Sequence, residues 1–114
     1  MDEMRQYVDA DNALERVRGN KTLYKTLLGS FLQNDHFDEL RQRIREGDAD
    51  AAARAAHAIK GLAANLSLPA LYETTLAMEQ KFKTGEIPQD ALPQLEEARD
   101  KTRRRVESVL SALS

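Results

Sequence analysis

The chain has 114 residues and a formal net charge of −2, so it fits one domain with a core that needs no metal or disulfide to hold it. Hydrophobic residues make up 41% and charged residues 32%, which is typical of a globular chain and not of a disordered one. Because cysteine is absent, a disulfide scaffold, a thiolate metal site and a cysteine nucleophile are excluded.

Two further classes of partner are disfavoured. The net charge and a pI near 5.7 argue against nucleic acid as the main partner. No apolar run approaches the roughly 18 residues of a membrane span, and the N-terminal sequence is not that of a signal peptide. We therefore expect a cytoplasmic domain that makes no membrane contact.

Glycine and proline divide the chain into expected helices. The first is short, capped by Asp9 or Asp11, and stops at Gly19, and the second runs from the N-cap Asn20 to about Asn34. The later ones are a third helix marked by Phe37, Leu40 and Ile44 and ended by Gly47, a fourth from about Asp48 to Leu66, a fifth from Pro69 to a stop at Gly85, and a last one from near Asp90. Short connections predict an all-α, up-and-down antiparallel four-helix bundle with an additional short N-terminal helix and a C-terminal helix.

Apolar patterns assign the buried faces of the second and fourth helices. In the second, one buried stripe is expected from residues at i, i+3, i+4 spacing, namely Leu23, Tyr24, Leu27, Leu28, Phe31 and Leu32. In the fourth, a side rich in alanine and leucine must face the core, and His57 falls nearly opposite its centre at about 100° per residue. The residues expected on this outer face with His57 are Asp50, Ala53, Arg54, Lys60, Gly61 and Ala64.

Gly61 is unusual because it lies inside a helix, one turn after His57 on the exposed face. Glycine there costs about 1 kcal/mol relative to alanine, and packing within the bundle does not require it. Close approach of another surface to His57 would require it. The alternative is that His57 is an ordinary solvated residue, Lys60 a surface charge and Gly61 a tolerated defect.

The segment AHAIKGLAANLSLPAL resembles the central signature of the histidine-containing phosphotransfer (HPt) domains of two-component phosphorelays. In that signature a histidine is followed by lysine at +3, glycine at +4 and small residues, as in His57, Lys60, Gly61 and Ala64. Downstream, LAMEQKFKTGE places Glu79 where the family usually has Glu or Gln near the imidazole. The resemblance covers roughly residues 8–112 of a single domain at 1–114. Two departures concern the end of the helix, Leu62 for a small residue and Ser67 for a frequent glycine.

The resemblance implies that His57 accepts a phosphoryl group and exchanges it with an aspartate on the receiver domain of a response regulator. A histidine kinase would be the other partner. Neutral imidazole has a lone pair for this attack, and Lys60 would stabilise the charge of the phosphoryl group. Glu79 would hold the other ring nitrogen. Space for the receiver would be left by Gly61, Ala64 and Ala53.

The sequence contains no glycine-rich phosphate loop and no kinase motif, so we expect a phosphotransfer carrier and not a complete enzyme. No cofactor or metal is expected on this chain, since the Mg²⁺ of such transfers would lie in the receiver's acidic site. We expect a monomer. A stand-alone protein and one domain of a hybrid histidine kinase both remain open, and the alternative function is a docking module that does not use the histidine.

Other candidates are expected to be ordinary surface features. His36, beside Asp35 and Asp38, is expected to be an exposed residue at the start of a helix. The basic residues at 41–45 and 101–105 have acidic residues on either side of them in the sequence, which indicates solvated helix faces more than nucleic-acid contacts.

Overall fold

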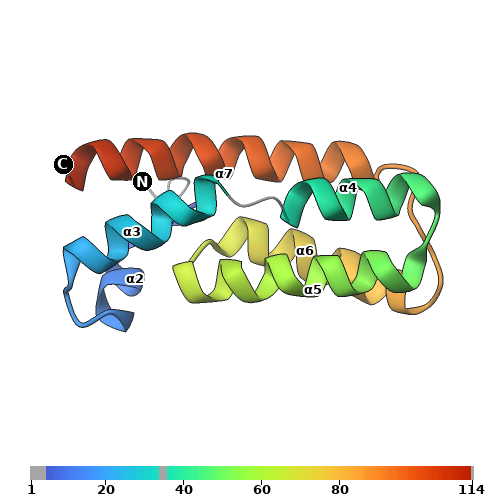
Figure 1. The fold of residues 1–114 in the computed structure, drawn as a ribbon, viewed down its shortest axis with the longest axis horizontal. Coiled ribbons are helices and arrows are strands. Elements are labelled where there is room, and N and C mark those ends of the chain that lie inside the picture. The colour runs from blue at the N-terminus through green and yellow to red at the C-terminus, as the bar shows by residue number, and fades with distance from the viewer. Residues whose placement is uncertain (1–4, 34–35, 114) are drawn as a thin grey trace.

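The computed structural model describes residues 5–33 and 36–113, and all regular structure in them is helical (Figure 1). In chain order the helices are α2 (Ala10–Arg16), α3 (Lys21–Leu32), α4 (His36–Glu46), α5 (Ala49–Leu66), α6 (Pro69–Lys83) and α7 (Ala91–Leu113). The all-α prediction is confirmed, and these helices begin and end close to the expected residues. The end expected at Asn34 lies outside the described residues.

Side-chain caps determine where three of the helices begin. Asp9, Asn20 and Asp48 each accept a hydrogen bond from the backbone N–H three residues later, at 3.2, 3.0 and 3.0 Å. These bonds satisfy N–H groups that have no partner within the helix. Asp9, and not Asp11, is thus the cap of α2. Gly47 follows the last residue of α4 and has a φ of +72°, a left-handed conformation that favours glycine.

The helices pack so that α5 lies between α4 and α6 and contacts both. The long helix α7 packs against α6 and α4, and so returns to the first of these four helices. Figure 1 shows α3 and α4 following one another along α7, with α2 beside α3. The Asp9 N–H, just before α2, donates to the carbonyl of Ser67 at the end of α5, at 2.9 Å. This end of α5 therefore lies near α2.

The core is apolar and is built mainly from leucine, alanine and phenylalanine. Its largest fully buried side chains include Tyr24, Phe31, Phe82, Leu28, Leu40, Ile59, Leu71 and Leu95. Phe31 of α3 and Phe37 of α4 meet edge to face with ring centroids 6.0 Å apart, which joins the two helices across the residues between them.

The prediction of one buried stripe on α3 is wrong for two residues. Leu23 is 43% exposed and Leu27 is 36% exposed, whereas Tyr24, Leu28 and Phe31 are buried. The buried residues centre on the side that packs on α7. Each of these two leucines precedes a buried residue, Tyr24 or Leu28, and is rotated about 100° from it around the helix axis. Leu23 and Leu27 therefore lie on a flank that the neighbouring described helices cover only in part.

Candidate functional site

Helix α5 presents His57 on its outer face, as the sequence predicts. The opposite side is buried and consists of Ala52, Ala55, Ala56, Ile59, Ala63 and Leu66. The side chain of His57 is 67% exposed. The imidazole is therefore open to another molecule while its helix is fixed by the core.

One residue expected on this outer face is buried. Ala53 is 8% exposed, so its placement on open ground beside His57 is wrong. At 100° per residue, Ala53 and Lys60 lie on the same side of His57, and Lys60 reaches Glu79 of α6. This edge of the outer face is thus the one that packs against α6, and the methyl group of Ala53 is buried there.

His57, Lys60 and Glu79, which are far apart in the sequence, are brought together by the packing of α5 on α6. His57 Nδ1 lies 2.9 Å from Glu79 Oε2. Lys60 Nζ lies 2.6 Å from Oε1 of the same carboxylate, and Lys83 Nζ lies 3.3 Å from Oε2. The side chain of Glu79 is 4% exposed, so a buried carboxylate holds three basic groups.

The charge of Glu79 is maintained by these neighbours. Burial alone would raise the pKa of its carboxyl, but hydrogen bonds from Lys60, Lys83 and His57, in that order, outweigh burial and lower the pKa below its ordinary value of 4.5. An ionised carboxylate can only accept hydrogen bonds. His57 Nδ1 must then carry the proton that points at Glu79, which leaves the lone pair of the neutral ring on Nε2.

The position of Lys60 differs from the one expected. Its side chain is only 19% exposed, and its ammonium group is used by Glu79. Lys83, which the sequence reasoning missed, is 65% exposed and contacts the same carboxylate from within α6. The spacing i, i+4 from Glu79 to Lys83 is a signal that the sequence contains, since such pairs face each other on a helix.

Gly61 is exposed, and a Cβ atom added to it would meet nothing within 4 Å. The fold therefore gives no steric reason for a glycine at this position. Ala64, one turn further, is half-buried and lines a hollow of about 330 Å³ with Asn12 and Arg16 of α2 and Tyr72 of α6. The surface of α5 beyond His57 therefore carries no large side chain at these two positions, and a partner could come close to the helix there.

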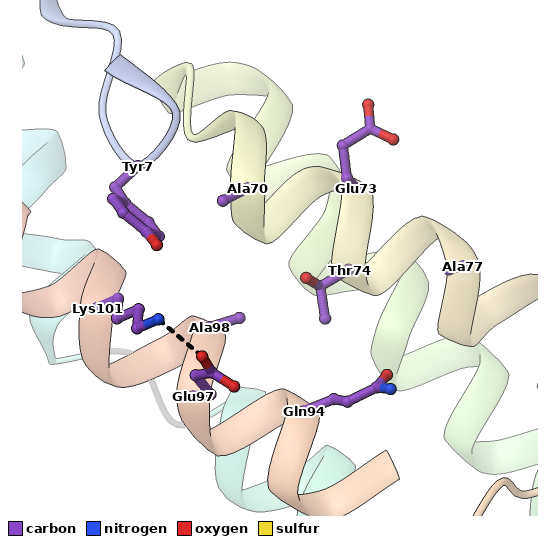
Figure 2. A pocket seen from close by; sticks show the side chains of 9 residues that line it. All are labelled: Tyr7, Ala70, Glu73, Thr74, Ala77, Gln94, Glu97, Ala98 and Lys101. Atoms are coloured by element: carbon purple, nitrogen blue, oxygen red, sulfur yellow. Dashed lines mark hydrogen bonds and ion pairs between the residues drawn. The ribbon is translucent and has the colours of Figure 1, made fainter. Parts of the chain in front are cut away.

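A second hollow lies elsewhere, between α6 and α7. It has a volume of about 390 Å³. Figure 2 shows Tyr7, Ala70 and Thr74 on one side of it and Ala98 and Lys101 on the other. Lys101 Nζ pairs with Glu97 at 2.7 Å within it. None of the three residues His57, Lys60 and Glu79 lines this hollow, so it is separate from the candidate site.

The remaining charged candidates do not form a second site. His36 is the first residue of α4 and is half-buried, where an exposed residue was expected. Within residues 5–33 and 36–113, no group of three or more His, Cys, Asp or Glu side chains could hold a metal ion. Many of the basic residues have intramolecular partners, among them Arg41 with Glu96, Arg43 with Glu39, Lys101 with Glu97 and Arg103 with the carbonyl of Leu32.

Comparison with known families decides the class of protein. The family described as "Hpt domain" matches residues 27–113. The chain belongs to the Hpt domain family. Hpt domains carry phosphoryl groups on histidine in phosphorelays, work with kinases and receiver domains, and are not catalysts with ATP sites.

A solved structure supports the fold of this Hpt domain. The HPT domain of an Hpt sensor hybrid histidine kinase from Shewanella superimposes with a TM-score of 0.72 at 19% identity, over 97% of this chain and 98% of that one. A search of curated protein sequences found no match. Among the helices that the structure describes, none has the length and apolar character needed to cross a membrane.

Proposed function

We propose that His57 is the phosphoacceptor of this Hpt domain and carries a phosphoryl group to or from an aspartate of a response-regulator receiver domain. The observation that carries this proposal is the pairing of an exposed imidazole with a buried carboxylate. Glu79 binds Nδ1 at 2.9 Å, so Nε2 is the nitrogen left to react. An ordinary solvated histidine needs no buried partner. Here the buried carboxylate is itself paired with two lysines, Lys60 and Lys83.

The chemistry follows from this arrangement. The Nε2 lone pair attacks phosphorus while the bond from phosphorus to the donor aspartyl oxygen breaks, and the bonding pair leaves with that oxygen. Glu79 accepts the Nδ1–H hydrogen bond throughout and stabilises the cationic ring that forms. The phosphoryl oxygens stay outside the bundle, where the partner supplies most of the positive charge. The Mg²⁺ that such a transfer uses would lie on the receiver, and we expect no cofactor on this chain.

The neighbours of His57 have distinct proposed roles. Lys60 contributes positive charge beside the phosphoryl group but does so from a position fixed by Glu79. Gly61 and Ala64 keep the surface low so that the loops of a receiver can reach the ring. Ala53 is buried and takes no part in this contact. We further propose that the chain acts as one cytoplasmic domain over residues 1–114, as a monomer, in exchange with a histidine kinase and a receiver.

Chemical phosphorylation tests the assignment without knowledge of the partner. The protein is incubated with phosphoramidate, and its intact mass is recorded before and after acid treatment. We expect one acid-labile phosphoryl group in the wild type and in His36→Gln, and none in His57→Gln. The chain has only two histidines, so His36→Gln is a complete control. Labelling that persists in His57→Gln would overturn the proposal and favour the docking module.

A further inference from the structure

Lys83 and His57 compete for one oxygen atom. Glu79 Oε2 lies 2.9 Å from His57 Nδ1 and 3.3 Å from Lys83 Nζ, whereas Oε1 is bound by Lys60 at 2.6 Å. Lys60 is 19% exposed and Lys83 is 65% exposed. Of the two lysines, Lys83 is therefore the one that shares an oxygen with the ring and the one that is well exposed to solvent.

The proton on Nδ1 decides whether a phosphorylated ring can give up its phosphoryl group. In transfer to a receiver, a carboxylate oxygen forms a bond to phosphorus, the bond from Nε2 to phosphorus breaks, and the bonding pair returns to Nε2. If Nδ1 keeps its proton, the ring leaves as neutral imidazole. If Nδ1 has lost it, the ring would have to leave as an anion, which is a much poorer leaving group.

We propose that Lys83 is a positioning residue that acts through Glu79. By sharing Oε2, Lys83 limits the negative charge that the carboxylate presents to Nδ1–H. The phosphorylated ring therefore loses its Nδ1 proton, and with it the ability to transfer, at a lower pH than it would without Lys83. This inference rests on the proposed role of His57 as the phosphoacceptor.

The charged groups around the carboxylate support this assignment. Within residues 5–33 and 36–113, the ionic partners of Glu79 are His57 and Lys60 from α5 and Lys83 from α6. The helices α4 and α7 supply none of these partners. Arg54, one turn before His57 on α5, is exposed and is screened by solvent. Lys83 is thus the exposed cation that touches the same carboxylate oxygen as the ring.

The first test measures the coupling in the unphosphorylated protein by following the His57 ring resonances in NMR as a function of pH. Lys83→Gln removes the cation that shares Glu79 Oε2 with the ring, so the midpoint of the titration should rise by about half a pH unit to one unit. Lys83→Arg should restore the wild-type midpoint. Lys81→Gln is the matched control, because Lys81 lies on the same helix but pairs with Glu86 at 3.8 Å. Equal midpoints in Lys83→Gln and Lys81→Gln would overturn the proposal.

The second test follows the phosphorylated protein, made with phosphoramidate, by the rate at which it loses its phosphoryl group to water across the pH range. In Lys83→Gln the fall of this rate with pH should shift to higher pH, in the same direction as the ring titration. A rate changed by the same factor at every pH would overturn the proposal, since it would mean that Lys83 contacts the phosphoryl group directly.

The two proposals fail in different ways. If His57 takes no phosphoryl group, the proposed function is wrong, yet the NMR titration still measures the effect of Lys83 on the ring. If His57 is phosphorylated but its titration ignores Lys83, the proposed function stands and this inference is wrong.

Discussion

Lys60 Nζ and Glu79 Oε1 lie 2.6 Å apart, and this ion pair joins α5 to α6 one turn along α5 from His57. Its two side chains are 19% and 4% exposed, so it is shielded from solvent far more than an ordinary surface pair. A lysine that follows the histidine at +3 therefore has a structural task here, besides any task toward a phosphoryl group. It keeps a buried carboxylate charged so that the carboxylate can hold the ring.

The first prediction concerns the stability that this pair provides. Lys60→Met should lower the free energy of unfolding by about 1–2 kcal/mol, because it leaves the buried charge of Glu79 with weaker partners. The loss stays below that of a fully buried pair since Lys83 and His57 remain. Urea denaturation measures it, with Lys81→Met as the control on an exposed pair. In a Glu79→Gln background the same substitution should cost less; an equal cost in both backgrounds would contradict the role of the pair.

The second prediction is the acid dependence of the same carboxylate. The pKa of Glu79 is lowered in the folded protein, since hydrogen bonds from the two lysines and His57 outweigh the effect of burial. Its contribution to stability is therefore complete above the ordinary value of 4.5 and is lost as the pH falls through the lower native value. The stability difference between wild type and Glu79→Gln, measured in urea, should shrink as the pH falls below 4.5. A difference that stays unchanged down to about pH 3 would refute it.

Helical periodicity was sufficient to predict the exposure of His57, because the opposite face of α5 is apolar over its whole length. The ends of the helices were also predictable, since Asp9, Asn20 and Asp48 are caps whose preference is local. Burial at the edges of a stripe was not. Leu23 is exposed and Ala53 is buried because the packing of neighbouring helices decides which edge is covered, and a single helix pattern does not contain that information.

The candidate site was predictable in its composition but not in its connections. The resemblance placed Glu79 near the imidazole, and the structure has its carboxylate 2.9 Å from Nδ1. That Lys60 points toward Glu79, and that Lys83 shares the carboxylate, depends on how far α6 is rotated about its axis against α5. Sequence spacing puts Glu79 and Lys83 on one face of α6 but does not say which helix that face meets.

The third prediction concerns Tyr24, which is 1% exposed and whose hydroxyl has no hydrogen-bond partner among the described residues. Burial, helped by the charge of Asp9 and opposed by Arg105, raises the pKa of Tyr24 to about 12. Tyr24→Phe removes a buried polar group without a partner, so it should stabilise the protein by about 1 kcal/mol at neutral pH.

The same substitution should change the response to alkali. Because the pKa of Tyr24 is raised in the folded state, its neutral form supports folding fully below 10 and this support is lost as the pH rises through about 12. Tyr24→Phe should therefore lose less stability than the wild type over that range, with Tyr72→Phe as the control for loss of a hydroxyl. Parallel alkaline unfolding curves for wild type and Tyr24→Phe would count against it.

The fourth prediction concerns the residue that ends α5. Ser67 has φ 56° and ψ 61°, a left-handed conformation that favours glycine. Its Oγ donates to Asn12 Oδ1 at 2.6 Å, which ties the end of α5 to α2. Ser67→Ala keeps the strain and loses the bond, so it should destabilise by about 1 kcal/mol. Ser67→Gly loses the bond but relieves the strain, and should be more stable than Ser67→Ala by about 1 kcal/mol; equal stability of these two variants in urea would show that the backbone is not strained.

The last prediction separates the structural effect of Gly61 from its effect on docking. Because a Cβ at this position meets nothing within 4 Å, Gly61→Ala should raise the free energy of unfolding by about 0.5–1 kcal/mol through its helix propensity alone. Gly61→Gln should also fold, and both variants should be labelled by phosphoramidate as fast as the wild type, since a small donor needs little space.

Transfer to a receiver should differ between these two variants. With a receiver domain that takes the phosphoryl group from the wild type, Gly61→Gln should transfer at least about tenfold more slowly, because its side chain lies where the partner must approach the ring. Ala58→Gln is the matched control, as Ala58 is exposed on α5 but lies about 100° around the helix from His57. If Gly61→Gln transfers as fast as Ala58→Gln, the glycine is a tolerated defect and the partner does not approach over this part of α5.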